Sequence, residues 1–215
     1  MNSNKHFDYI PNRMSLIHKI LDSNELNPLL ELESNETDAF VNNSNDLDIR
    51  NVLKKKVLDF GQVINTIGSK LVYIKSGTTG HTFRGFDPTN PSNPNYAVKV
   101  VAYPKRENYG DPNDIRRPEN AELMMLKVLS YFVINNQTPH LVLPIGTFNT
   151  SIKPFLGLQK NKIVDNKKYS QFIKRHKKGD LHPEVSVLIS EWANGGDLLE
   201  YIRKNYQTMQ LKTWR

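Results

Sequence analysis

The sequence predicts an α+β fold in which a five-stranded antiparallel sheet packs against one long helix. Five apolar, β-prone segments alternate with turn-rich stretches, and a single long helical pattern separates the third segment from the fourth. The first two segments flank the turn 77–80, so we expect them to form a hairpin. The expected strands are 71–76, 81–86, 96–103, 140–148 and 185–192.

The long helix is expected over residues 119–133, after Pro118 at a position that suits a helix start. Pro139 ends that region. A second, short helix is expected over 198–206, because glycines and an aspartate at 195–197 turn the chain out of the fifth strand.

Two stretches lie outside this regular pattern. Residues 1–60 form an extension rich in Asn, Ser and acidic residues, with a net charge of −5 over residues 1–50 (4 Lys and Arg against 9 Asp and Glu). It is expected to be helical between Met14 and Leu30 and loosely docked or disordered over 31–48. Residues 149–184 carry 9 Lys and Arg against 3 acidic residues, and we interpret them as a basic insertion in a hairpin.

Composition excludes several classes of protein. The absence of cysteine excludes disulfides and cysteine-ligated metal and fits an intracellular protein. No apolar run approaches the length of a membrane-spanning helix, and the N-terminus lacks a signal pattern, so no membrane partner is expected. The net charge of +12 over residues 51–215 suggests affinity for phosphates, nucleic acid or acidic surfaces, but a solvated lysine-rich surface is the preferred explanation.

The order of the motifs resembles the N-terminal lobe of eukaryotic-type, serine/threonine-type protein kinases over residues 68–210. A glycine-containing hairpin, an Ala-Val-Lys strand, a helix with glutamates, two strands and a Gly-Gly-Asp turn follow one another as in that family. The resemblance implies a kinase-like lobe at 63–192, with a hinge and the start of a second lobe at 193–215, and ATP as the ligand.

The glycine-containing turn resembles the loop that covers the ATP phosphates in kinases. By this resemblance Gly77, Thr78, Thr79 and Gly80 bind phosphate, and Thr82 contacts the adenine. The first glycine of the family pattern is replaced by Lys75. Taken by itself, such a sequence is an ordinary hairpin turn.

The Ala-Val-Lys strand and the helix imply an ion pair. Lys99 resembles the lysine that binds the α and β phosphates, Glu122 its partner on the helix, and Ala97 the small residue over the adenine. Glu119, one turn earlier, is the alternative partner. Leu126 would belong to the hydrophobic spine that positions the helix. Without the resemblance, Lys99 could simply lie on a solvated face and both glutamates could be surface residues.

The segment that ends the fifth strand carries the closest match. By resemblance Ser190 is the gatekeeper residue, the Glu191 carbonyl and the Ala193 amide bind the adenine edge, and Asp197 binds the ribose. Asp197 could instead, or also, cap the following helix.

The catalytic loop and the metal-binding Asp-Phe-Gly of kinases are not found after the hinge. Asp59-Phe60-Gly61 precedes the glycine turn, and we interpret it as a coincidence. The expectation is therefore a chain without its C-terminal lobe, without a metal site of its own, and inactive in phosphotransfer by itself, with Mg²⁺ needed only in a complete protein.

Three functions remain open at this level. The first is the ATP-binding part of a serine/threonine-type kinase with an unknown protein substrate; its composition and long insertion resemble kinases of large DNA viruses. The second is a non-catalytic interaction module that binds an acidic partner through the basic insertion. The third is a nucleotide-binding pseudokinase. Nucleic acid is an unfavoured partner, because only Tyr169 and Phe172 accompany the basic run 174–179.

The expected absence of the second lobe also predicts exposed apolar surface. We expect it on the long helix, on the fourth strand and on the apolar residues of 198–202.

Overall fold

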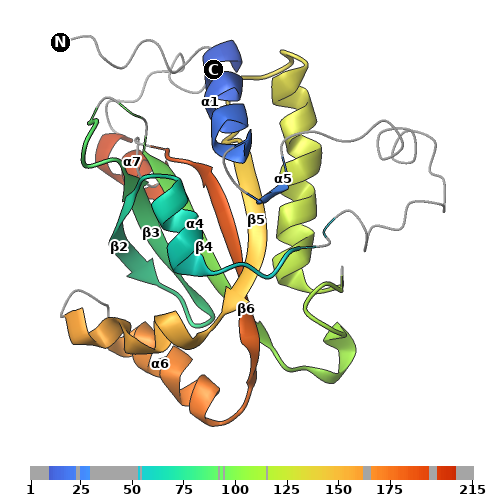
Figure 1. Cartoon of the computed structure of the whole chain (residues 1–215), viewed down its shortest axis with the longest axis vertical. Coiled ribbons are helices and arrows are strands. Elements are labelled where there is room, and N and C mark those ends of the chain that lie inside the picture. The colour runs from blue at the N-terminus through green and yellow to red at the C-terminus, as the bar shows by residue number, and fades with distance from the viewer. Residues whose placement is uncertain are drawn as a thin grey trace.

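Six antiparallel strands form one sheet in the order β1-β5-β6-β4-β3-β2 (Figure 1). The structure is a computed structural model that describes residues 10–22, 25–29, 53, 55–91, 93, 95–114, 116–161, 166–193 and 198–206. The strands are β1 Asn27–Pro28, β2 Lys70–Ser76, β3 Gly80–Phe86, β4 Tyr96–Pro104, β5 Pro144–Ser151 and β6 Leu181–Glu191.

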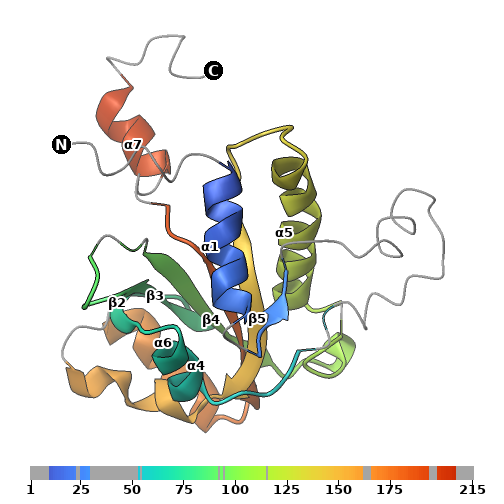
Figure 2. The ribbon, with the colours of Figure 1, turned by 45° about the horizontal axis from the view of Figure 1, so that its top comes forward.

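Helices cover both faces of this sheet. The α-helices are α1 Ile10–Asp22, α4 Phe60–Thr66, α5 Pro118–Ile134, α6 Asn166–Lys177 and α7 Leu198–Asn205, and two 3₁₀ segments are η1 Glu107–Tyr109 and η2 Lys153–Asn161. Helices α1 and α5 lie side by side at one end of the molecule, over β5 (Figures 1 and 2). Within the described residues, no helix combines the length and the apolar content needed to cross a bilayer.

The predicted α+β class is confirmed, and each of the five predicted strands is present with shifted ends. The sheet has a sixth strand, β1, whose two residues pair with Thr147 and Gly146 of β5. So short a strand leaves no periodic signal in the sequence. The fourth strand starts at Pro144 and not at 140, because the residues before it form a loop held by side-chain hydrogen bonds.

The N-terminal helix also differs from its expected range. It covers Ile10–Asp22, whereas Met14 to Leu30 was expected. Leu26 and Leu29, which extended the apolar pattern in the sequence, are buried beside β1 and not in a helix. The expected loose segment 31–48 lies outside the described residues.

Strand β4 separates two apolar clusters by its alternation. Tyr96, Val98 and Val100 are buried on one face, whereas Ala97 and Lys99 are only partly buried on the other. The first face belongs to the larger cluster, which includes residues of α1, α4, β5, β6, η2 and α6. On the face of α5, a smaller cluster consists of Leu29, Leu53, Leu123, Met124 and Leu188, with Leu126 packed against it.

The expectation of an exposed fourth strand is wrong for β5 itself, although Val142, within the predicted range 140–148, is 41% exposed. Residues 144–150 of β5 are all buried, because β1 pairs with its free edge and α1 packs on it. Exposed apolar side chains do occur on the long helix and on α7, where Met125 is 59% and Leu199 is 54% exposed. Two elements of the N-terminal extension, β1 and α1, therefore cover β5.

The basic connection between β5 and β6 packs on the sheet through aromatic side chains. Its residues Phe155, Tyr169 and Phe172 are buried and surround His81 of β3, with ring centroids 6.1, 5.7 and 4.6 Å from the imidazole. His81 Nδ1 lies 2.9 Å from the Ser76 hydroxyl oxygen. The connection is thus part of the main core and not a separate arm.

Burial lowers the pKa of His81 from 6.5 to about 4, so acid should destabilise this packing. The unfolded chain binds a proton at residue 81 more readily than the folded chain does between these two pH values. The free energy of unfolding should therefore fall by about 2 kcal/mol from pH 7 to pH 5 through this residue. Urea unfolding at both pH values measures it, and His81→Phe should reduce the difference. An equal pH dependence in the variant would contradict the assignment to His81.

Glycine 80 is required by the packing of β3 on β4. A Cβ atom at this position would overlap the carbonyl oxygen of Val100, whereas a Cβ at Gly77 would have its nearest neighbour, the Gly80 carbonyl oxygen, at 3.9 Å. Gly77 therefore has room for a side chain, whereas Gly80 has none.

Gly80→Ala should lower the free energy of unfolding by roughly 1–3 kcal/mol, because the strands must separate to admit the methyl group. Gly77→Ala is the matched control in the same turn and should leave stability nearly unchanged. Thermal or urea unfolding of the two variants makes the comparison. Equal stabilities would show that β4 can move away at little cost.

Candidate nucleotide-binding site

The partly open face of β4 carries four of the predicted site residues. Lys99 pairs with Thr82 of β3, and Ala97 pairs with Ser190 of β6. Residues directly opposite one another in antiparallel strands project to the same face of the sheet. Thr82, Ala97, Lys99 and Ser190 thus share one surface, on the side where α5 packs.

Lys99 and Glu122 form an ion pair between β4 and α5. Lys99 Nζ lies 2.5 Å from Oε1 and 2.7 Å from Oε2 of Glu122. The side chains are 42% and 45% exposed, so water screens the pair and its contribution to stability is at most about 1 kcal/mol. The alternative partner, Glu119, does not make this contact. One of its oxygens, Oε2, is buried without a hydrogen-bond partner in the described part of the chain.

The turn at 77–80 is tight and is tied to β4. Gly77 N donates to the Gly80 carbonyl at 2.8 Å, and Ala102 N donates to the Thr79 carbonyl at 2.7 Å. Thr78 is exposed and Thr79 is half-buried. Lys75, which replaces the first glycine of the kinase pattern, is exposed and pairs with Thr82.

The end of β6 forms one border of the face. The Ser190 hydroxyl donates to the Glu191 carbonyl at 3.3 Å, and Ala193 is exposed. Asp197 lies outside the described residues. The guanidinium of Arg84, which is opposite Ala97, lies 5.9 Å from the ring of Trp192. The sequence prediction missed Arg84, although its position two residues after Thr82 places it on the same face.

A buried lysine holds the first turn of α5 against the sheet. Lys55 Nζ donates to the Tyr103 hydroxyl at 2.5 Å, to Asn120 Oδ1 at 2.8 Å and to the Ser186 hydroxyl at 3.0 Å. Tyr103 in turn donates to Asn149 Oδ1 at 2.8 Å. The network therefore joins α5 to β4, β5 and β6, two residues before Glu122.

Arg117 supports the same end of α5 and is fully buried. Its guanidinium donates to three backbone carbonyls, those of Pro104 at 2.9 Å, Gly110 at 2.7 Å and Asp111 at 2.7 Å. Lys55 and Arg117 were both missed, because a run of lysines and a pair of arginines look like solvated surface in a sequence.

Asp59-Phe60-Gly61 has a structural function. Asp59 is the N-cap of α4, and its Oδ1 accepts a hydrogen bond from Gln62 N at 2.8 Å. Asp59 therefore starts the helix that precedes β2. Among the described residues, no three His, Asp or Glu side chains converge as metal ligands.

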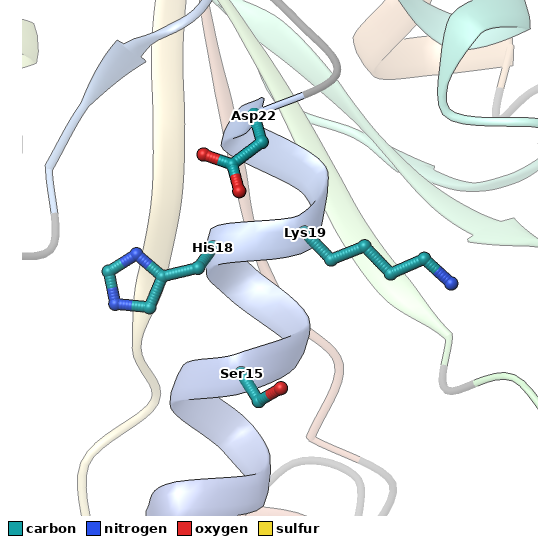
Figure 3. A pocket seen from close by; sticks show the side chains of 4 residues that line it. All are labelled: Ser15, His18, Lys19 and Asp22. Carbon is teal, nitrogen blue, oxygen red and sulfur yellow. The ribbon is translucent and has the colours of Figure 1, made fainter.

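A shallow hollow of about 590 Å³ lies on the outer side of α1, lined by Ser15, His18, Lys19 and Asp22. Figure 3 shows that these side chains diverge from one helix face and do not converge on a common point. None of them belongs to the predicted site, so this hollow does not compete with the face of β4 as the candidate site.

The motif-based resemblance is confirmed by comparison with a viral protein. The chain is 47% identical, over 208 residues and 94% of its length, to a protein of Acanthamoeba polyphaga mimivirus named "Putative serine/threonine-protein kinase". The chain is thus similar to a protein of a large DNA virus that is named as a kinase of this type. It spans 42% of the length of that relative. No family model matches the chain, and a comparison with solved structures finds no significant match.

Burial lowers the pKa of Lys55 from 10.5 to about 7, so the folded chain should gain stability relative to the unfolded chain as the pH rises. Between these values the unfolded chain binds more protons at Lys55 than the folded chain, and stability must rise with pH. Urea unfolding should show a gain of about 2 kcal/mol from pH 7 to pH 9. Lys55→Met should flatten this rise, and a rise of unchanged size in the variant would assign it to other groups.

Proposed function

We propose that the chain binds ATP on the open face of β4, with Lys99 held by Glu122 as the contact for the phosphates. The observation that carries this proposal is the Lys99–Glu122 ion pair itself. A lysine with two carboxylate oxygens within 2.7 Å and 42% of its side chain exposed is both oriented and accessible. A surface lysine without such a partner would have to lose its rotamer freedom on binding.

The remaining predicted residues fit around such a ligand. Ala97 leaves room for a flat base beside Lys99, and the backbone at Glu191 and Ala193 offers a carbonyl and an amide to the adenine edge. Gly77, Thr78, Thr79 and Gly80 would cover the phosphates, Thr82 would lie against the adenine, and Asp197 would bind the ribose. These roles follow from the kinase resemblance and are part of the proposal.

In the whole protein, we propose that this lobe serves phosphoryl transfer from ATP to a serine or threonine hydroxyl of a protein. Bound ATP supplies the phosphoryl group, and Mg²⁺ neutralises charge on it. In this chain, Lys99 and Glu122 would bind and orient the phosphates. The catalytic-loop and Asp-Phe-Gly motifs of kinases are not found among residues 193–215, and the chain spans 42% of the relative's length.

An acidic protein partner at α6 is a second proposal, favoured by the placement of its charges. Lys167, Lys168 and Lys174 are exposed, whereas Tyr169 and Phe172 are buried beneath the helix. Buried rings cannot stack on bases, which disfavours single-stranded nucleic acid as the partner. A cationic helix face fits an acidic protein surface.

Lys99→Met should weaken ATP binding by about tenfold or more, because it removes a charged hydrogen-bond donor to phosphate. Isothermal titration with ATP, with and without Mg²⁺, measures the affinity. The melting temperature should stay close to that of the unmodified chain, since the ion pair is exposed. Lys70→Met, which replaces an exposed lysine of β2, is the matched control and should bind ATP normally. Equal affinities for the Lys99 and Lys70 variants would reject the proposal.

A further inference from the structure

Helix α1 reaches the border of the candidate site through one side chain. Arg13 Nε and a terminal nitrogen of Arg13 donate to the two carboxylate oxygens of Glu191, at 2.8 and 2.7 Å. The two side chains are only 10% and 19% exposed. This paired geometry is the strongest arrangement for an arginine and a carboxylate, and it fixes the direction of both side chains.

The same guanidinium also binds the loop between α5 and β5. It donates to the carbonyls of Leu141 at 2.6 Å and Pro139 at 3.1 Å. Arg13 thus joins three segments that are distant in the sequence, namely α1, the loop that follows the helix of Glu122, and the end of β6.

Glu191 is held from a second side. Its Oε2 accepts a hydrogen bond from Leu143 N at 2.7 Å, and its own backbone N donates to the Leu143 carbonyl at 3.0 Å. Both the side chain and the backbone of Glu191 are therefore restrained where β6 ends. The Glu191 carbonyl and the Ala193 amide are the two groups that the proposed function assigns to the adenine edge.

We propose that α1 is a positioning element for nucleotide binding, in which Arg13 holds the end of β6 in the conformation that receives the base. This inference rests on the proposed function. Arg13 touches no ligand in this scheme and acts through Glu191. The position of the Arg13 side chain depends on how α1 packs on the sheet. Ile17 of α1 is fully buried in the larger cluster, and Met14 packs against that cluster. A helix of 13 residues is marginal in isolation, so this packing is what keeps Arg13 in place.

A purely structural ion pair would give a different pattern of binding. Loss of stability lowers the amount of folded protein and affects every ligand alike. Displacement of the Glu191 backbone should weaken binding of the base, whereas the phosphate contact at Lys99 stays intact. The experiment must therefore compare a ligand that has a base with one that has none.

The test is displacement of a fluorescent ATP analogue from the full 215-residue chain by ADP and, separately, by inorganic tripolyphosphate. Arg13→Lys keeps the charge but loses the two-pronged contact, and Arg13→Met removes both. In Arg13→Lys, we expect the affinity for ADP to fall about tenfold, within the usual range for coupled sites, with that for tripolyphosphate unchanged. Lys99→Met should weaken both ligands. Lys19→Met, on the exposed side of α1, is the matched control and should behave like the unmodified chain.

Two results for a folded Arg13→Lys chain would overturn the inference. Unchanged ADP affinity in a folded Arg13→Lys chain, or an equal loss for both ligands, assigns Arg13 a structural role only. If Arg13→Met fails to fold, as judged by circular dichroism, Arg13→Lys decides the question. An unmodified chain that binds neither the analogue nor ADP rejects the proposed function itself, which is distinct from binding that ignores residue 13.

Discussion

The alternation of strand β4 is the constraint on which the rest of the structure depends. Val98 and Val100 are buried against the larger cluster, and Lys99 between them projects to the opposite, partly open face. A register shift of one residue would place an ammonium group in the apolar core and two valines in water. Pairing with β3 on one side and β6 on the other prevents such a shift. The candidate site is therefore a direct consequence of how the core is packed.

The second requirement is the position of α5 along its axis relative to β4, because this position decides whether Glu122 faces Lys99. Its apolar residues Leu123 and Met124 meet Leu188, but apolar packing tolerates sliding, whereas directional hydrogen bonds do not. Lys55 and Arg117 supply such bonds at the start of the helix. A buried cation must have its donors satisfied at fixed places, so this polar layer specifies where Glu122 lies. Burial of Lys55 and Arg117 costs desolvation free energy, but their hydrogen bonds fix the position of α5.

The N-terminal extension and the basic connection between β5 and β6, which lie outside the kinase-like pattern, both pack on the sheet. The basic connection packs on β3 through Phe155, Tyr169 and Phe172, which are buried. Its residues Lys167, Lys168 and Lys174 are exposed. The N-terminal helix covers β5 and reaches the end of β6 through Arg13. Both segments contribute to the larger apolar cluster of the sheet, although neither carries a family motif.

The sequence by itself determined the α+β class and the succession of the main strands along the chain, because these follow from local periodicity. It named Lys99 and Glu122 as partners only through the resemblance to kinases, and it left Glu119 as the alternative. Only the tertiary structure decided the contacts of Arg13, Lys55 and the strand β1. Each of these depends on residues far apart in the chain, and a lone arginine, a run of lysines or a two-residue strand has no periodic signal. The same reason explains why the fourth strand was expected to be exposed: its cover comes from a segment more than a hundred residues earlier in the chain.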